Sequence, residues 1–569
     1  MFIPTTKEEV KKLGWDSLDV ILVTGDSYID SPFVGVSLIG KLLIKEGFRV
    51  GIIAQPDINS KTDISRLGEP GLFWGITGGC IDSMVANYTA SKKRRKKDDY
   101  TAGGNNTRRP DRAVIVYSNL VRQYFKKTRP IVLGGIEASL RRIPHYDFWS
   151  NRLRKSIIFD AKADYIVYGM GEKTTVELAN RLRDGSDAKD IPGICYISNK
   201  PREGYIELCS FNDLLVDKNA FVDMFNVFYR NNDPLKAKGM YQKHDLRYLV
   251  HNPPAPYLLS KELDAVYDLN FERDLHPYHK KFGQVRALDT IKFSIPTHRG
   301  CYGECNFCAI SMHEGTTVSW RSEKSIIREA KLLAAHPDFK GYILDVGGPT
   351  ANMYGFECEK KLSGGSCTDK RCIHPKICSM LKPDHQKQIK LLKSLRKING
   401  IKKIFISSGI RYDLLLGDKI NGEKYLKEII LHHISGQLKI APEHTEEKIL
   451  KLMGKPGTNS LLEFVDKFYK HTKEAGKEQY LTYYFMVSHP GCNEDEIKKM
   501  KSFISNRLKI NTEQVQIFTP TPSTYSTLMY YTQVNPFNKN KIYVEKDIPK
   551  KEKLKQIITS KRNVTHKNK

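Results

Sequence analysis

Three cysteines in the sequence are spaced for iron–sulfur chemistry. Cys301, Cys305 and Cys308 form a C-x3-C-x2-C pattern directly after the apolar run 291–295. Thiolates at this spacing on one short loop can hold three irons of a cuboidal iron–sulfur cluster. Because the next cysteine in the chain is Cys358, the fourth iron would have no protein ligand close by and would stay open to a small molecule. The pattern therefore predicts a cluster that binds a ligand at one iron.

A structural zinc loop is the alternative interpretation of these cysteines. Zinc sites of that kind usually combine two C-x2-C-like turns into four ligands, whereas this loop offers three cysteines. Gly300 and Gly303 would let the backbone wrap closely around a cluster, and Phe307 offers a ring to shield it. These neighbours favour the iron–sulfur interpretation over zinc.

The cysteine loop resembles the signature of the radical S-adenosylmethionine (SAM) superfamily. The resemblance implies a 4Fe–4S cluster whose open iron binds the amino and carboxylate groups of SAM. It also implies that one electron, from a low-potential donor such as flavodoxin or ferredoxin, cleaves SAM to methionine and a 5′-deoxyadenosyl radical. That radical takes a hydrogen from a substrate. In such enzymes the cofactors carry the chemistry, and the protein supplies binding, orientation and exclusion of water.

The segments around the loop alternate between strands and helices. Strands are predicted at 291–295, 342–346, 403–407, 437–441, 480–487 and 514–518. Helices are predicted between them at 322–335, 384–398, 422–432, 446–453, 460–475 and 494–508. This alternation predicts a partial (β/α)6 TIM-like barrel over residues 286–525, and barrel enzymes place their chemistry at the carboxyl ends of the strands. The cysteine loop follows the first strand, where such chemistry is expected.

Other residues at the ends of these strands are candidate contacts to SAM. They are Gly347, Gly348, Pro349 and Thr350 after the second strand, Ser408 and Arg411 after the third, and Glu443 after the fourth. The resemblance implies that the glycine-rich backbone meets the SAM amino group. The polar side chains would meet its ribose, carboxylate or sulfonium. Since Gly and Ser end strands in many proteins, only their shared position supports these contacts, and no catalytic residue can be named.

A second group of cysteines lies in an insertion at 356–380. Cys358, Cys367, Cys372 and Cys378 fall within a polar, glycine-containing loop directly after the second barrel strand. Four reduced cysteines at this density could bind a structural zinc or an auxiliary iron–sulfur cluster. The alternative is four unrelated thiols.

The N-terminal 204 residues have the pattern of a Rossmann-like parallel sheet. Strands are predicted at 19–23, 49–54, 113–117, 131–133 and 165–168, with helices at 33–45, 137–142 and 172–182. Glycines follow the last two strands, at Gly134-Gly135 and Gly169-Met170-Gly171-Glu172, and open α/β sheets bind ligands at that edge. The pattern resembles the cobalamin-binding-like domain that precedes many radical SAM domains. It lacks a D-x-H-x-x-G segment to ligate cobalt, so cobalamin is not supported, and the alternative is a scaffold that shapes the substrate site.

Composition limits the remaining possibilities. A chain of 569 residues should contain two or three domains, and we expect a mostly helical connector at 205–285. The N-terminus does not read as a signal peptide and no apolar run is long enough to span a bilayer, so we expect a cytoplasmic protein in which clustered cysteines bind metal. The net charge of +28 is concentrated at 92–97 and in a basic tail at 526–569, which should be solvated. Nucleic-acid binding is not favoured, because no stacking or groove-reading motif accompanies the charge.

The chain as a whole resembles the YgiQ-type radical SAM family. The resemblance rests on residues 1–57, the cysteine loop, the four-cysteine insertion and Thr519-Pro520-Thr521-Pro522-Ser523-Thr524. It implies the cofactor class and leaves the substrate open. Two alternatives remain: an enzyme that methylates or methylthiolates RNA or protein, and a non-catalytic protein that binds metal or nucleic acid.

Overall fold

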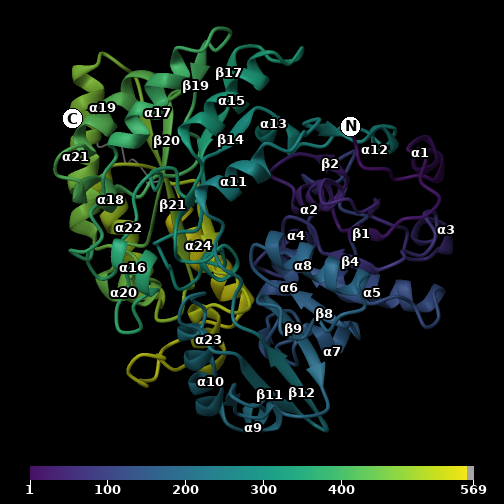
Figure 1. Cartoon of the computed structure of the whole chain (residues 1–569). Coiled ribbons are helices and arrows are strands. Elements are labelled where there is room, and N and C mark those ends of the chain that lie inside the picture. The colour runs from purple at the N-terminus through teal and green to yellow at the C-terminus, as the bar shows by residue number, and fades with distance from the viewer. Residues whose placement is uncertain (561–569) are drawn as a thin grey trace, which may run out of the picture.

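The structure, a computed structural model, describes residues 1–560 and consists of two halves. Figure 1 shows the N-terminal half, drawn from purple to blue, beside the C-terminal half, drawn from green to yellow. One large sheet forms the centre of the N-terminal half, whereas short parallel strands with helices around them form the C-terminal half. None of the helices in the described residues has the length and apolar character that would be needed to cross a bilayer.

Five parallel strands lie side by side in the N-terminal sheet. Their order is β3 (Val50–Ala54), β1 (Val20–Thr24), β4 (Phe73–Thr77), β5 (Ile131–Gly134) and β8 (Tyr165–Val167). In chain order this is 2-1-3-4-5, so the direction of winding reverses between β1 and β4. An open α/β sheet binds ligands in the crevice outside the carboxyl ends of its strands at that reversal.

Helices cover both faces of this sheet. Those on one face are α2 (Gly35–Lys45) and α8 (Glu172–Arg183), and those on the other are α5 (Ala113–Tyr124) and α7 (Ile157–Ala161). Successive residues of a strand point to opposite faces. In β1, Val20 and Leu22 accordingly join the core beneath α2 and α8, whereas Ile21 and Val23 join the core on the α5 side. The two-sided burial explains why the strands are apolar at every position.

The strand predicted at 113–117 is wrong, because these residues begin helix α5. The Ala-Val-Ile-Val-Tyr run has strand-like composition, but its apolar pattern continues through Leu120 and Val121 at helical spacing and buries one face. The actual third strand of the sheet is β4, whose sequence Phe-Trp-Gly-Ile-Thr was not recognised. The other four predicted strands of the parallel sheet are confirmed within a few residues.

The region 205–285 is not a mostly helical connector. It contributes β10 (Ile206–Leu208), β11 (Met240–His244) and β12 (Arg247–His251), which extend the large sheet through β9 (Ile194–Ser198) to nine strands. The pairings of β8 with β9, β9 with β12 and β12 with β11 are antiparallel. The helices of this region are α9 (Phe211–Val216), α10 (Lys218–Arg230), α11 (Ser260–Tyr267) and α12 (Pro277–Lys280). The large sheet is therefore mixed, with a parallel part and an antiparallel edge.

Seven strands of the C-terminal half, which fall in the six predicted strand segments, pair in parallel. β14 (Ser294–Pro296) pairs with β18 (Asp345–Gly347), and β17 (Tyr342–Ile343) pairs with β19 (Lys403–Ile404). β21 (Tyr480–Val487) lies between β20 (Gln437–Glu443) and β22 (Val515–Ile517). A single parallel bridge, between Ile410 and Ile440, links the third segment to the fourth. Each segment thus lies beside the segment that follows it in the chain.

The helices predicted between these strands are present. They are α15 (Glu323–Ala334), α17 (Gln386–Arg396), α19 (Gly422–His432), α20 (Glu447–Met453), α21 (Thr458–Glu474) and α22 (Glu494–Phe503), which continues as a π-helix at Ile504–Leu508. Ser322 caps α15 as expected, because its side chain accepts a hydrogen bond from Ser325 N. The apolar faces of the strands and helices meet in one core that includes Ile295 and Leu438.

The segment after residue 525 is folded rather than a solvated tail. α23 (Tyr525–Thr532) packs on α10 of the N-terminal half, and α24 (Ile548–Thr559) packs on α22 and β22. Leu554 and Ile558 of α24 are buried in the C-terminal core. The lysine-rich sequence is therefore an amphipathic helix with one buried apolar face. The last part of the predicted tail, 561–569, lies outside the described residues.

Candidate active site between the two halves

The cysteine loop runs between the two halves of the molecule. It follows β14 and β15 (His298–Arg299) and leads into α14 (Ile310–His313), which packs on α6 (Gly135–Leu140) of the N-terminal half. Gly300 has a φ of +82°, and a Cβ atom there would lie 2.2 Å from the carbonyl oxygen of Thr317. Only glycine fits this close backbone contact, which sets the direction in which the loop leaves the strand.

The sulfur atoms of Cys301 and Cys305 lie on the same side of Gly303. A Cβ atom at Gly303 would be 3.1 Å from Cys301 Sγ and 3.6 Å from Cys305 Sγ. Cys308 is held in the same turn, because its backbone N–H donates to the carbonyl oxygen of Cys305 at 2.9 Å. A side chain at Gly303 would therefore project among the sulfurs, and its absence leaves space for a cluster.

The thiols need positive charge to ionise together. Burial raises the pKa of Cys301 and of Cys308 above that of an ordinary thiol, and the neighbouring Cys305 raises both further because thiolates repel one another. Iron ions would supply the compensating charge, as metal binding removes protons from cysteine ligands. The donor set and the space at Gly303 fit an iron–sulfur cluster held by these three residues.

Asn306 fixes the middle of the cysteine loop to three distant segments. Its backbone N–H donates to the carbonyl of Met453 at 2.8 Å, and its side-chain Nδ2 donates to the carbonyl of Leu452 at 2.8 Å. Its carbonyl accepts from Ser526 N at 2.8 Å, and its Oδ1 accepts from Arg371 at 2.7 Å. Asn306 is only 4% exposed. Sequence reasoning missed this residue, since nothing in the motif shows partners so far away in the chain.

Arg411 lies against the cysteine loop. Its Nη1 donates to Cys305 Sγ at 3.5 Å, and its Nε and Nη2 donate to the two oxygens of Asp413 at 2.8 and 2.6 Å. Asn352 is fully buried, and its side chain makes two hydrogen bonds with the backbone of Arg411. Arg411 N–H donates to Asn352 Oδ1 at 2.8 Å, and Asn352 Nδ2 donates to the Arg411 carbonyl at 2.9 Å. The guanidinium predicted to contact SAM is thus also a positive charge beside Cys305, a predicted cluster ligand.

The glycine-rich segment after β18 faces the same loop. Thr350 Oγ1 lies 3.9 Å from Cys301 Sγ, and the carbonyl of Thr350 is 3.0 Å from His298 Nε2. A Cβ atom at Gly348 would be 2.7 Å from that imidazole nitrogen, and one at Gly347 would be 3.0 Å from Ser408 Oγ. Both glycines therefore allow neighbouring strand ends to approach closely.

Ser408 is positioned by Asp345, a residue that sequence reasoning did not select. The Ser408 hydroxyl donates to Asp345 Oδ2, while the backbone N–H groups of Ser407 and Ser408 donate to Asp345 Oδ1 at 2.7 and 3.1 Å. Asp345 begins β18, at the end of the predicted second strand. The sequence feature that could have identified Asp345 is a carboxylate at a strand end that is followed by glycines.

Glu443 lies at the carboxyl end of β20. The register between β20 and β21 shifts between Ile440 and Glu443, and Glu443 has a φ of +69°. Such irregularities redirect side chains next to functional sites. Burial raises the pKa of Glu443 to about 7, although the charges of Lys455 and Arg411 oppose the shift. This carboxyl group can therefore hold or release a proton near neutral pH.

A cavity of about 620 Å³ lies between the two halves. Gly347, Gly348, Pro349 and Ser408 line it on the side of the C-terminal half. The opposite wall comes from the carboxyl edge of the N-terminal sheet, including residues next to β1 and β4, where the winding reverses. Apolar side chains make up most of the rest of the wall. The cavity thus joins four of the seven predicted SAM-binding residues to the carboxyl edge of the large sheet, whereas Thr350, Arg411 and Glu443 do not line it.

The four-cysteine insertion packs beside the cysteine loop. Cys358 is buried in a small core with Tyr302, and Cys301, Cys372 and Cys378 pack against that core. Cys367 is not part of it. Within residues 1–560, no three His, Cys, Asp or Glu side chains are arranged to hold a single metal ion. A metal at Cys358, Cys367, Cys372 and Cys378 therefore stays a prediction.

Comparison with known proteins identifies two family models and several close relatives. The radical SAM N-terminal model matches residues 2–294, and the radical SAM superfamily model matches residues 295–504. A UPF0313 protein of Fusobacterium nucleatum is 58% identical over 562 residues, covering 99% of each chain. A UPF0313 protein of Thermotoga maritima is 48% identical over 566 residues, again covering 99% of each chain.

Among solved structures, the fold is similar to that of the radical SAM methyltransferase TsrM from Kitasatospora setae. The TM-score is 0.51 at 15% sequence identity, and the match covers 90% of this chain and 74% of TsrM in the structure solved with cobalamin and a 4Fe–4S cluster. A second structure of TsrM, with tryptophan substrate and a SAM analogue, gives the same TM-score and identity. At this identity the likeness shows the fold alone.

Proposed function

The chain belongs to the UPF0313 family, the YgiQ-type family of radical SAM enzymes, and on this premise we propose how its residues divide the work. Cys301, Cys305 and Cys308 hold the 4Fe–4S cluster. When bound, the cluster supplies the electron that cleaves SAM to a 5′-deoxyadenosyl radical, which abstracts a hydrogen from the substrate. The substrate binds in the cavity between the two halves.

The continuity of the cavity is the observation that carries this proposal. One wall contains Gly347, Gly348, Pro349 and Ser408, which are four of the seven predicted contacts to SAM, and the other wall contains the carboxyl edge of the N-terminal sheet. A radical formed at the first wall would meet a substrate held at the second without crossing water. Exclusion of water protects a reactive intermediate from side reactions.

Each residue at the SAM-binding wall has a separate task in the proposal. Gly347 and Gly348 let backbone carbonyls approach the SAM amino group, and Ser408, fixed by Asp345, offers a hydroxyl to the polar part of SAM. Arg411 compensates negative charge at Cys305. Glu443, which lies within the electrostatic reach of Arg411, would stabilise the sulfonium or accept a hydrogen bond from a ribose hydroxyl.

The strand pairings of the C-terminal half support a partial (β/α)6 barrel. Neighbouring segments pair in parallel in chain order from β14 to β22, and helices follow most of them. We infer that these segments form the curved wall of a TIM-like barrel whose open mouth faces the N-terminal sheet. All proposed SAM contacts follow the carboxyl ends of its strands, as in other barrel enzymes.

The direct test is anaerobic reconstitution with iron and sulfide, followed by addition of dithionite and SAM. We expect release of 5′-deoxyadenosine, abolished by replacement of Cys301, Cys305 or Cys308 with Ala. Cys195→Ala is the matched control, because that thiol is fully buried in the N-terminal core away from the loop. Unchanged 5′-deoxyadenosine release from a Cys305→Ala variant would contradict the assignment. Reduction by flavodoxin or ferredoxin in place of dithionite tests the proposed electron donor.

Binding of cobalamin is a second candidate, favoured by the solved neighbour. TsrM binds cobalamin, and this chain has a similar fold with a large cavity at the carboxyl edge of its parallel sheet. Against it, residues 25–35 after β1 contain no histidine, and Asp26 is already bound by Arg109 and by the N–H of Cys80. Titration of the protein with hydroxocobalamin, followed by gel filtration and visible absorbance, decides the question. Stoichiometric retention supports a methylating enzyme, and no retention excludes that route.

A second metal centre at Cys358, Cys367, Cys372 and Cys378 stays part of the proposal. Its support is the packing of three of these thiols in one small core next to Cys301. Iron and zinc should be counted in a Cys301→Ala/Cys305→Ala/Cys308→Ala variant after reconstitution. Residual metal that is lost on adding Cys372→Ala supports a second site, whereas a metal-free triple variant contradicts it.

RNA as the substrate remains the third candidate. Five consecutive basic residues, 93–97, are exposed on one loop of the N-terminal half. Phosphate binding by such a loop weakens steeply with salt. Retention of bulk transfer RNA at moderate salt, lost when these residues are changed to Gln, would support RNA modification, and no retention would remove it.

A further inference from the structure

Two carboxyl groups lie near one guanidinium in the cavity wall, where α8 of the N-terminal half meets β15 and the residue after α14. Glu172, the first residue of α8, is 3% exposed and forms an ion pair with Arg299 through Oε1, while its Oε2 has no hydrogen-bond partner. Glu314 follows α14, and its Oε2 accepts a hydrogen bond from Gly300 N at 3.0 Å. Glu172, Glu314 and Arg299 all line the cavity.

The other charged groups close to this pair do not balance it. Lys173 is bound to Glu262 at 2.8 Å, and Arg299 also donates from Nε to the hydroxyl of Tyr267 at 3.1 Å. His313 is neutral, because burial lowers its pKa to about 4. Burial raises the pKa of Glu314, so this carboxyl group resists ionisation when no further cation is present. If both carboxylates were ionised against one guanidinium, they would leave excess negative charge, and an unpaired buried charge is costly.

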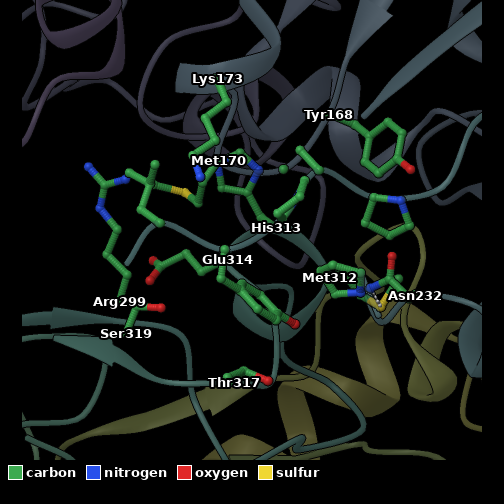
Figure 2. Close-up of a pocket in the computed structure, with 18 of the residues that line it drawn as sticks. Tyr168, Met170, Lys173, Asn232, Arg299, Met312, His313, Glu314, Thr317 and Ser319 are labelled. Atoms are coloured by element: carbon green, nitrogen blue, oxygen red, sulfur yellow. Dashed lines mark hydrogen bonds between the residues drawn. The ribbon is translucent and has the colours of Figure 1, made fainter. Parts of the chain in front are cut away.

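Figure 2 shows a smaller chamber that opens off this wall. Arg299 and Glu314 lie at one end of it, and Asn232 and Met312 lie at the other. The chamber and the cavity share Met170, Arg299, His313 and Glu314 as walls. The carboxylate of Glu314 therefore stands where the two spaces meet, accessible to a ligand in the cavity.

The same excess of acid occurs elsewhere in the cavity wall. Asp26 lines the cavity and shares Arg109 with Asp98, at 2.5 and 3.1 Å, which is again two carboxylates on one guanidinium. The chain as a whole has a net charge of +28, so an acidic cavity is a local exception. Apolar side chains from α2, β1 and β4 surround the acidic groups. The wall thus suits a molecule with an apolar body and a cationic end.

We propose that Glu172 and Glu314 bind a protonated amine on an apolar substrate. The proposal rests on the proposed function, because it names the substrate class of the same cavity. The ammonium group would donate to the free Oε2 of Glu172 and restore the charge balance around Arg299. SAM is also a cation, but its proposed contacts are at Gly347 and Ser408, which are different lining residues from Glu172 and Glu314. The amine site is therefore a second cationic site, separate from that for SAM.

Isothermal titration of the reconstituted full-length protein with n-octylamine tests the proposal, with octan-1-ol and octanoate as comparison ligands. We expect the amine to bind at least tenfold more tightly than the alcohol, and octanoate to bind most weakly. Glu172→Gln should weaken amine binding about tenfold and leave alcohol binding unchanged. Glu177→Gln is the matched control, since Glu177 lies on the same helix and bonds only to exposed Arg181. Equal binding of amine and alcohol to the native protein would overturn the proposal.

A second variant tests the proposal in case Glu172→Gln fails to fold. Glu314→Gln keeps an oxygen that can accept from Gly300 N while it removes the charge, so it should fold and still lose amine affinity. Titration with SAM should give the same affinity for all variants, and a parallel loss of SAM affinity would overturn the separation of the two sites. Release of 5′-deoxyadenosine is measured independently. Its absence alongside selective amine binding would reject the proposed function and leave the amine site standing.

Discussion

Arg411 allows the electrostatics of the cysteine loop to be tested with substitutions of opposite sign. Its Nη1 lies 3.5 Å from Cys305 Sγ. Two unit charges at this distance interact by about 5 kcal/mol at an effective dielectric constant of ~20, which corresponds to roughly 200 mV for a one-electron couple. The carboxylate of Asp413 lies 2.6 and 2.8 Å from the same guanidinium and acts on the cluster with the opposite sign. Because the added electron is shared over several atoms, we expect each of these two charges, taken alone, to move the potential by on the order of 50 mV.

Arg411→Met should therefore make the cluster harder to reduce, with a midpoint potential lower by about 50 mV. Asp413→Asn leaves the guanidinium uncompensated and should raise the potential by a similar amount, about 50 mV. Arg411→Lys keeps the charge and should change the potential least. The measurement is a redox titration of the reconstituted protein followed by electron paramagnetic resonance. Shifts of the same sign in Arg411→Met and Asp413→Asn, or no shift in either, would refute the reasoning.

Three further predictions concern the loop and helix α24. Gly303→Ala should lower the iron content after reconstitution, because its Cβ would lie 3.1 Å from Cys301 Sγ; colorimetric iron analysis checks this, and full loading would contradict it. Asn306→Ala should destabilise the native state by about 2 kcal/mol, since it leaves buried partners unsatisfied; urea unfolding measures the change, with Asn506→Ala as the surface control. Lys551 is 1% exposed, and burial lowers its pKa to about 8. Between pH 8 and the ordinary pKa of lysine, the unfolded state therefore binds more protons than the folded state. The free energy of unfolding should thus rise with pH in this range. Lys551→Met should thus stabilise the protein by about 1–2 kcal/mol at pH 7, and this gain should shrink towards pH 10; a gain that grows with pH would disprove it.

The local patterns around the metal loop were readable from the sequence. Short sequence motifs predicted this part of the site, namely the spacing of Cys301, Cys305 and Cys308 and the glycines after β18. The helices of the C-terminal half were equally predictable, because each buries a face at helical spacing. In each case, the residues of the segment itself are enough to determine its structure.

The remaining parts of the fold depend on contacts that no local pattern records. The run 113–117 has strand-like composition, yet packing on the large sheet makes it helical, while β4 is the strand. β11 (Met-Tyr-Gln-Lys-His) and β12 (Arg-Tyr-Leu-Val-His) pair antiparallel and lack the continuous apolar run of a buried parallel strand, so a search for such runs overlooks them.

The candidate site shows the same limit. The loop residues were predicted, but the hydrogen bonds that hold Asn306 come from residues near 453 and 526. The contact from Arg411 to Cys305 and the ion pair of Arg299 with Glu172 likewise join segments far apart in the chain. One sequence without an alignment cannot reveal such pairs.

The bond from Ser526 N to the Asn306 carbonyl has a consequence for biogenesis. The cysteine loop gains this hydrogen bond only when α23, close to the end of the chain, has docked. A nascent polypeptide on the ribosome would expose the three thiols before that partner is synthesised. Assembly machinery must then deliver iron and sulfide after release, and ribosomal stalling shortly before α23 should yield an apoprotein that oxygen readily damages.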